Sequence, residues 1–127
     1  MKTDRLTLSD VASLPGDRDL LFCQFLDDFR HEPSTTCLRL LVSEPAPTGD
    51  DRFDAKLAAA AELLSNRRGI TPPKWVFYPG RYLSERYYMA ERVCAKDPAA
   101  RKWFEDTTPE EFSSRNLFCG PDPLARC

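Results

Sequence analysis

The chain has 127 residues, of which 42% are hydrophobic and 30% charged, and its net charge at pH 7 is -2. This length suffices for one domain with one core, and the composition excludes a disordered chain. Proteins that bind duplex nucleic acid usually carry excess positive charge, so the balance argues against DNA or RNA as the main partner without excluding a local basic patch. No stretch contains the roughly 18 apolar residues of a membrane span, and the N-terminus lacks the apolar run of a secretory signal.

Helical patterns dominate the first third of the chain. A short helix is expected over residues 7–14, because Thr7 and Asp10 have the spacing of a capping box. Residues 17–32 place four large apolar side chains on one helical face, and Pro33 ends that helix. Residues 34–44 fit either a helix or a strand; the helix is preferred, since hydroxyl side chains there can cap it and no strand is available to pair with.

The strongest helix pattern follows a linker at residues 45–51, which contains two prolines and a glycine. Residues 51–68 carry an acidic cap at the start and two arginines at the end, and Gly69 ends the helix. A run of four alanines within it permits close packing by neighbouring elements. Near the C-terminus, residues 97–106 begin with an Asp cap and a proline, and Thr108 and Glu111 have capping-box spacing.

These patterns predict an all-α fold: one compact domain over residues 1–127, with about six helices, little or no sheet and an internal linker near residues 45–51. Leu117 and Phe118, close to the C-terminus, are expected to pack back onto the body of the domain.

No pattern of catalytic residues is present, so the protein is predicted not to be an enzyme. The chain has no glycine-rich phosphate loop, no G-x-S-x-G and no H-E-x-x-H. Its one histidine, His31, lies at a predicted helix end, where a cation is favoured without any catalytic role. We therefore expect no cofactor and no catalytic residue.

The five cysteines are odd in number and widely spaced. This spacing is unlike that of zinc ligands and predicts reduced thiols rather than a disulfide framework. We therefore expect no metal site, and a cytoplasmic protein in which all five thiols are free. Those residues are Cys23, Cys37, Cys94, Cys119 and Cys127.

Residues 67–92 interleave arginines with aromatic side chains, and three interpretations remain open. The aromatic rings can fill the core, they can anchor a protein partner, or they can stack on single-stranded nucleic acid. The prolines at 72 and 73 are expected to direct Trp75 inward, whereas the turn at residues 79–80 is expected to start a short polar helix. The candidate partner-binding residues are Tyr78, Arg81, Arg86 and Tyr87.

From about residue 20 onward the chain resembles a family of small, uncharacterised actinobacterial-type proteins. The resembling segments are FLDDF, EPAPTGDDRFDAKLAAAAELLSNRRGITPPKW, YPGRYLSE and TPEEFSSRNLFCGPDPLAR. Such proteins are encoded beside nucleotidyltransferase-like toxins of the AbiEii class, often with an N-terminal helix-turn-helix domain. Only about 19 residues precede the resembling part here, too few for such a domain, so direct operator binding is not expected.

The resemblance implies an antitoxin-like or regulatory component of a toxin–antitoxin or defence locus. The expected mechanism is occlusion of a protein partner, such as a nucleotidyltransferase-like toxin, by a rigid helical surface. The alternative is a nucleic-acid-binding regulator that uses the Arg/Tyr-rich region 67–92. A membrane partner is not expected.

Overall fold

The computed structural model describes residues 7–121 and 123–124, apart from the side chains of residues 34, 35 and 38. The fold is all-α, as predicted, with seven α-helices, two short 3-10 helices and one pair of two-residue strands in this part of the chain. In chain order the elements are α1 (Leu8–Ser13), α2 (Arg18–Arg30), α3 (Ser34–Val42), α4 (Asp51–Arg68), η1 (Lys74–Phe77), η2 (Pro79–Arg81), β1 (Tyr87–Tyr88), α5 (Glu91–Lys96), α6 (Pro98–Thr107), α7 (Glu110–Ser113) and β2 (Leu117–Phe118).

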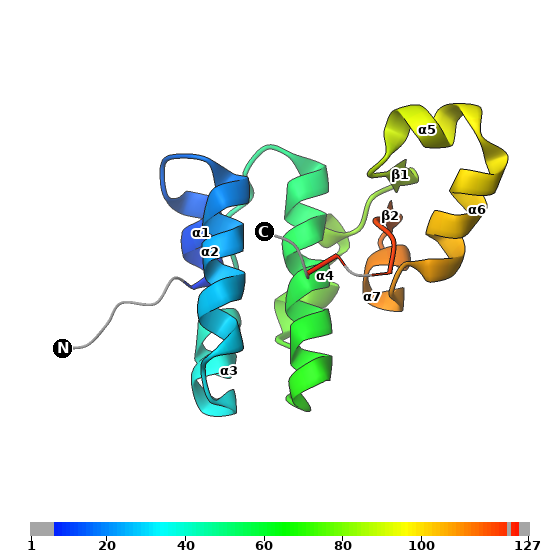
Figure 1. The fold of residues 1–127 in the computed structure, drawn as a ribbon. Coiled ribbons are helices and arrows are strands. Elements are labelled where there is room, and N and C mark those ends of the chain that lie inside the picture. Colours follow the sequence, from blue (N-terminus) through cyan, green and yellow to red (C-terminus); the bar gives the residue numbers. More distant parts are fainter. Residues whose placement is uncertain (1–6, 122, 125–127) are drawn as a thin grey trace.

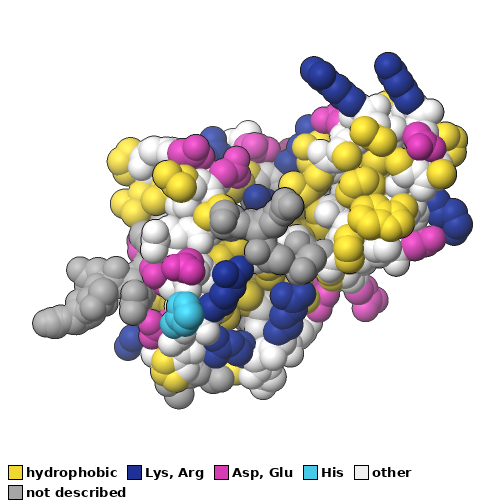
Figure 2. All heavy atoms as spheres, in the orientation of Figure 1, with side chains coloured by type: hydrophobic (Ala, Val, Ile, Leu, Met, Phe, Trp, Pro, Cys, Tyr) yellow, Lys and Arg dark blue, Asp and Glu magenta, His cyan; other side chains and the backbone are white. Residues whose placement is uncertain are grey.

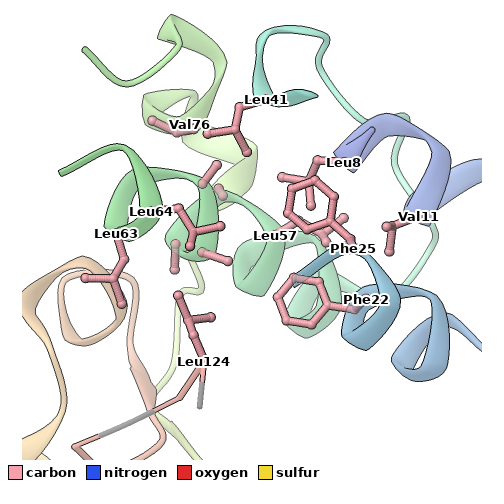
Figure 3. Packing of buried hydrophobic residues seen from close by; sticks show 14 of the residues in the cluster. Leu8, Val11, Phe22, Phe25, Leu41, Leu57, Leu63, Leu64, Val76 and Leu124 are labelled. Atoms are coloured by element: carbon pink, nitrogen blue, oxygen red, sulfur yellow. The ribbon is translucent and has the colours of Figure 1, made fainter. Parts of the chain in front are cut away.

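Helix α4 is the central element. Helices α1 to α3 lie on one side of it, and α5 to α7 lie with the strands on the other (Figure 1). Its alanines from Ala58 to Ala61 are fully buried, because their short side chains let elements on both sides approach the helix closely. One connected hydrophobic core results. Figure 3 shows Phe22 and Phe25 of α2 beside Leu57 of α4.

Local caps explain where several helices begin and end. The Thr7 hydroxyl accepts from the Asp10 N–H, and the Asp10 carboxylate accepts from the Thr7 N–H, which is the predicted capping box. Asp50 caps the start of α4, and Gly69, the C-cap residue after Arg68, has the left-handed φ of 68°. Residues 34–42 form the helix that was preferred for them, α3.

Arg68 ties the C-terminal ends of α2 and α4 together. Its guanidinium donates to the carbonyl oxygens of Phe29, Arg30 and Glu32 at distances of 2.8–3.1 Å. These carbonyls lie at a helix end, where they lack partners within the helix. An arginine of the predicted Arg/Tyr-rich region is thus used to join two helices.

The linker before α4 is held down by a buried carboxylate. Asp54 is 6% exposed, and its carboxylate accepts from both the N–H and the hydroxyl of Thr48. Pro45, in the same linker, is fully buried. The linker therefore follows a defined path across the first turns of α4.

Two local predictions were wrong. The residues after η2 do not form a helix; they run through bends into β1, which pairs in parallel with β2 through Tyr87 with Leu117 and Tyr88 with Phe118. Thr108 does not cap α7. Its hydroxyl donates to the Phe104 carbonyl and accepts from the N–H groups of Cys119 and Gly120, and Pro109 takes the N-cap position.

The thiol prediction was also wrong at one position. Cys23 is disulfide-bonded, whereas Cys37, Cys94 and Cys119 are free thiols. Disulfides persist mainly in oxidising compartments. The expected cytoplasmic location therefore loses the argument that five reduced cysteines supplied. Cys127 lies outside the described residues.

Candidate functional site

The structure separates the four predicted partner-binding residues. Tyr78 is 49% exposed in a turn between η1 and η2, and Arg86 and Tyr87 lie at the start of β1. Arg81 is only 4% exposed. Tyr78 is also absent from the hollows that surround Tyr87, so these residues do not form one surface.

Arg81 is a buried link between segments, which corrects the expectation that it is exposed. Its guanidinium donates to the carbonyl oxygens of Pro45 and Asp54 and lies 3.3 Å from the Glu44 carboxylate. The same group stacks on the Trp75 ring. The hydrogen bonds join η2 to segments 27 to 37 residues away in the sequence, and the side chain is not accessible to a partner.

Trp75 lies in the core, as predicted. It is 3% exposed, and its indole N–H donates to the Leu41 carbonyl oxygen at 2.9 Å. Arg115, which is fully buried, donates to the Glu62 carboxylate and to the Val76 carbonyl oxygen, each at 2.6 Å. The core interpretation of the aromatic stretch thus holds for Trp75 but not for the exposed Tyr78.

Tyr87 lies where several elements meet. Its N–H donates to the Asn116 carbonyl oxygen at 2.8 Å, which fixes β1 against the segment that leads into β2. On the other side, the guanidinium carbon of Arg52, from α4, lies 3.9 Å from the centre of the Tyr87 ring. This distance is within the range of a cation–π interaction.

Arg86 belongs to a small polar cluster with Tyr88 and Glu105. The Arg86 guanidinium donates to the Glu105 carboxylate at 2.7 Å, and the Tyr88 hydroxyl also contacts that carboxylate. The hydrogen bond to Tyr88 and the charge of Glu105 raise the pKa of Arg86 above its ordinary value. The guanidinium is therefore charged at every physiological pH, and the cluster joins β1 to α6.

A hollow of about 540 Å³ opens between the start of α4, β1, α5 and α6. We call it the arginine pocket. Four arginines line it, together with Tyr87, Tyr88, Glu91, Cys94 and Ala95; the arginines are Arg52, Arg86, Arg92 and Arg101. Its volume falls in the range of small-molecule sites.

Large apolar side chains are exposed on the same lobe. Figure 2 shows hydrophobic side chains gathered over the part of the molecule that Figure 1 assigns to the strands, α5 and α6. Met89, Val93 and Trp103 are each between 51% and 55% exposed, and α6 contributes no buried residue. We call these three residues the arm surface.

Sequence reasoning identified part of this site. Arg86, Tyr87 and Arg92 lie in the stretch that the interleaved arginines and aromatic residues singled out. Arg52 and Arg101 come from α4 and α6, outside that stretch, and only the packing of these helices brings them to the pocket. The sequence also contained a signal for the exposed Trp103, because it lies on α6, a short helix with an amphipathic pattern.

Within the described part of the chain, no three His, Cys, Asp or Glu side chains are grouped in a way that could hold a metal ion. Among the same residues, no helix combines the length and the apolar character that crossing a bilayer requires.

Comparisons with protein-family models, with curated proteins and with solved structures find no match to this chain. The resemblance to proteins encoded beside nucleotidyltransferase-like toxins therefore stays a prediction, and the functional argument depends on this chain's own geometry.

Proposed function

We propose that this chain is a non-enzymatic protein-binding component and that its partner docks on the arm surface, with Trp103 as the main anchor. The observation that carries the proposal is the half-exposed Trp103 on a helix that buries none of its residues. Tryptophan and methionine are enriched in protein interfaces, and tryptophan is among the commonest residues whose loss weakens binding strongly.

The charges around the arm surface favour a protein over a membrane or a nucleic acid. Residues 91–107 carry equal numbers of acidic and basic side chains: Glu91, Asp97, Glu105 and Asp106 against Arg92, Lys96, Arg101 and Lys102. Helices that bind anionic lipid or phosphate backbones carry a basic excess. A partner with an apolar groove and a mixed polar rim fits this surface better.

Trp103 is also held in place before any partner arrives. Its ring lies edge-on to the Phe104 ring, with the two centres 5.1 Å apart, and it covers the backbone at Gly120. A side chain that is already ordered loses little conformational freedom when it binds, so more of its contact energy contributes to affinity.

The nucleic-acid alternative loses support because two of its arginines are used elsewhere in the fold. Arg68 bonds to the end of α2, and Arg81 is buried against Trp75. The antitoxin-like role stays a proposal that follows from the resemblance alone. Under it, the first partner to test is the nucleotidyltransferase-like protein that the resemblance implies.

The experiment has two stages. A photo-crosslinking amino acid replaces Val93 on the arm surface or, as a control, Leu20 on α2, which is 68% exposed. A partner that crosslinks from position 93 alone is then purified, and its Kd is measured against wild type, Trp103→Ala and Leu20→Ala. Trp103→Ala should weaken binding at least ~30-fold, the effect of an interface anchor, whereas Leu20→Ala should change the Kd less than about threefold.

Three results would overturn the proposal. One is equal crosslinking from both positions, and another is an unchanged Kd for Trp103→Ala. The third is a concentration-dependent dimer of the chain that Trp103→Ala abolishes, because the occupant would then be a second copy.

A further inference from the structure

The arginine pocket has an excess of positive charge, and the protein-docking proposal assigns no role to it. Two of its arginines face carboxylates: Arg52 lies 3.8 Å from Glu91, and Arg86 lies 2.7 Å from Glu105. Arg92 and Arg101 have no ion-pair partner among the described residues, although both are exposed and line the same hollow. The pocket therefore contains two guanidinium groups that are not paired with a carboxylate of the described residues.

Among the three hollows that share Arg52 and Tyr87, only the arginine pocket has an excess of positive charge. Two neighbouring hollows share Arg52 and Tyr87 with it, but their charges balance. One has Asp51 and Glu85 against Arg52 and Arg86, and the other has Asp19 and Asp50 against Arg52 and Lys56. A nucleic-acid strand that continued out of the pocket would meet these carboxylates, so the arrangement suits a compact anion.

We propose that the arginine pocket binds a phosphate-bearing small molecule of about the size of a mononucleotide, with its phosphate groups on Arg92 and Arg101. A guanidinium presents two parallel N–H groups that match the oxygens of a phosphate, and arginine is enriched where phosphate is recognised. The volume of about 540 Å³ exceeds the needs of a single inorganic phosphate and leaves room for an attached group.

Two of the four pocket arginines, Arg52 and Arg86, are held in place without a ligand. Arg52 is stacked on Tyr87, Arg86 is bonded to Glu105, and Arg92 and Arg101 project from the two packed helices α5 and α6. The residues involved differ from those of the arm surface. On α5, Arg92 lines the pocket and the adjacent Val93 does not, and on α6 the same holds for Arg101 and Trp103. This inference therefore does not depend on the proposed protein partner.

The test uses the purified protein and four probes: inorganic phosphate, pyrophosphate, ADP and adenosine. Calorimetry at about 150 mM NaCl gives each Kd, since salt at that level screens exposed charges beyond roughly 8 Å and suppresses non-specific attraction. Side-chain Nε–Hε signals of arginine in NMR spectra show where each probe binds. Arg92→Ala and Arg101→Ala are compared with Arg39→Ala, which removes another exposed arginine, on α3 and outside the pocket.

We expect pyrophosphate and ADP to bind with millimolar or better affinity and to shift the Arg92 and Arg101 signals. ADP should bind at least tenfold more tightly than phosphate, and adenosine should not bind. The double variant of Arg92 and Arg101 should weaken ADP binding at least tenfold, whereas Arg39→Ala should leave it within about twofold.

Saturable binding of pyrophosphate with no gain for ADP would overturn the mononucleotide size but leave a phosphate site. An effect of Arg39→Ala equal to that of the pocket variants would overturn the proposal, because attraction would then depend on net charge alone. The absence of binding by any probe at this salt concentration would do the same. None of these results bears on Trp103→Ala, so failure here and failure of the proposed function remain distinguishable.

Discussion

The guanidinium carbon of Arg81 lies 4.9 Å from the centre of the Trp75 ring, and both side chains are buried. Through this pair, η1 and η2 are joined to α3 and to the linker before α4. Trp75 bonds to the Leu41 carbonyl, and Arg81 bonds to the carbonyl of Pro45. A charged and an aromatic side chain thus close the core together.

Arg81→Ala should destabilise the fold strongly. Its loss leaves the buried Pro45 carbonyl without its donor, which costs about 1–3 kcal/mol, and removes packing against Trp75 as well. Arg86→Ala is the matched control, since its side chain is 61% exposed and should change stability by less than about 0.5 kcal/mol. Urea unfolding of both variants measures the difference. Equal midpoints would show that Arg81 does not hold these segments.

Trp75 should show a graded response. Trp75→Ala should lower the free energy of unfolding by ~3–5 kcal/mol, as large-to-small core changes do. Trp75→Phe keeps an aromatic ring but loses the bond to Leu41, so it should cost less than Trp75→Ala. Thermal and urea unfolding give the ranking. Equal costs for the two variants would mean that the ring itself contributes nothing.

Thr108→Val should destabilise the C-terminal segment although it preserves the size of the side chain. The N–H groups of Cys119 and Gly120 lose their acceptor, at a cost of about 1–3 kcal/mol for each one left unpaired. Thr107→Val is the control, because that hydroxyl only donates to the Trp103 carbonyl at an exposed position. Amide hydrogen exchange at residues 119 and 120 should accelerate in the first variant alone.

The cysteines should separate into two classes when the unfolded protein is alkylated without reductant. Cys37, Cys94 and Cys119 should take up the label, and Cys23 should take it up only after reduction. Peptide mass spectrometry measures the label at each position. Full labelling of Cys23 without reductant would show that the disulfide is absent.

Cys119 should make stability fall as the pH rises above neutral. Burial raises the pKa of this thiol to about 12, whereas an unfolded thiol has a pKa of about 8.5. Below about pH 8.5 the thiol is protonated in both the folded and the unfolded protein, so its full contribution to the free energy of unfolding is present. Above that pH the thiol of the unfolded protein loses its proton first, so stability declines toward about pH 12. Melting temperatures measured between about pH 8 and 9.5 should fall less steeply for Cys119→Ser. Identical slopes would contradict the assignment.

How much of the fold could be predicted varies with the range of the interactions involved. Patterns within a few residues predicted the start of α1 and the ends of α4, because a cap is a bond between positions two or three apart. The prolines just before Trp75 likewise predicted its inward direction. The amphipathic pattern of α2 and the run of alanines in α4 likewise predicted which faces of these helices are buried in the core. These features follow from the sequence by itself.

Tertiary structure alone decided the roles of the arginines and of Thr108. Arg81 and Arg86 are the same residue type in the same stretch, yet Arg81 is buried and Arg86 is exposed. Only Arg81 meets the carbonyl of Pro45, 36 residues earlier in the linker. Thr108 has a capping-box spacing but bonds instead to amides 11 and 12 residues later. Arg52 and Arg101 reach one pocket through helix packing. Such choices depend on which distant polar groups the fold brings within hydrogen-bonding distance, and short-range patterns carry no record of that.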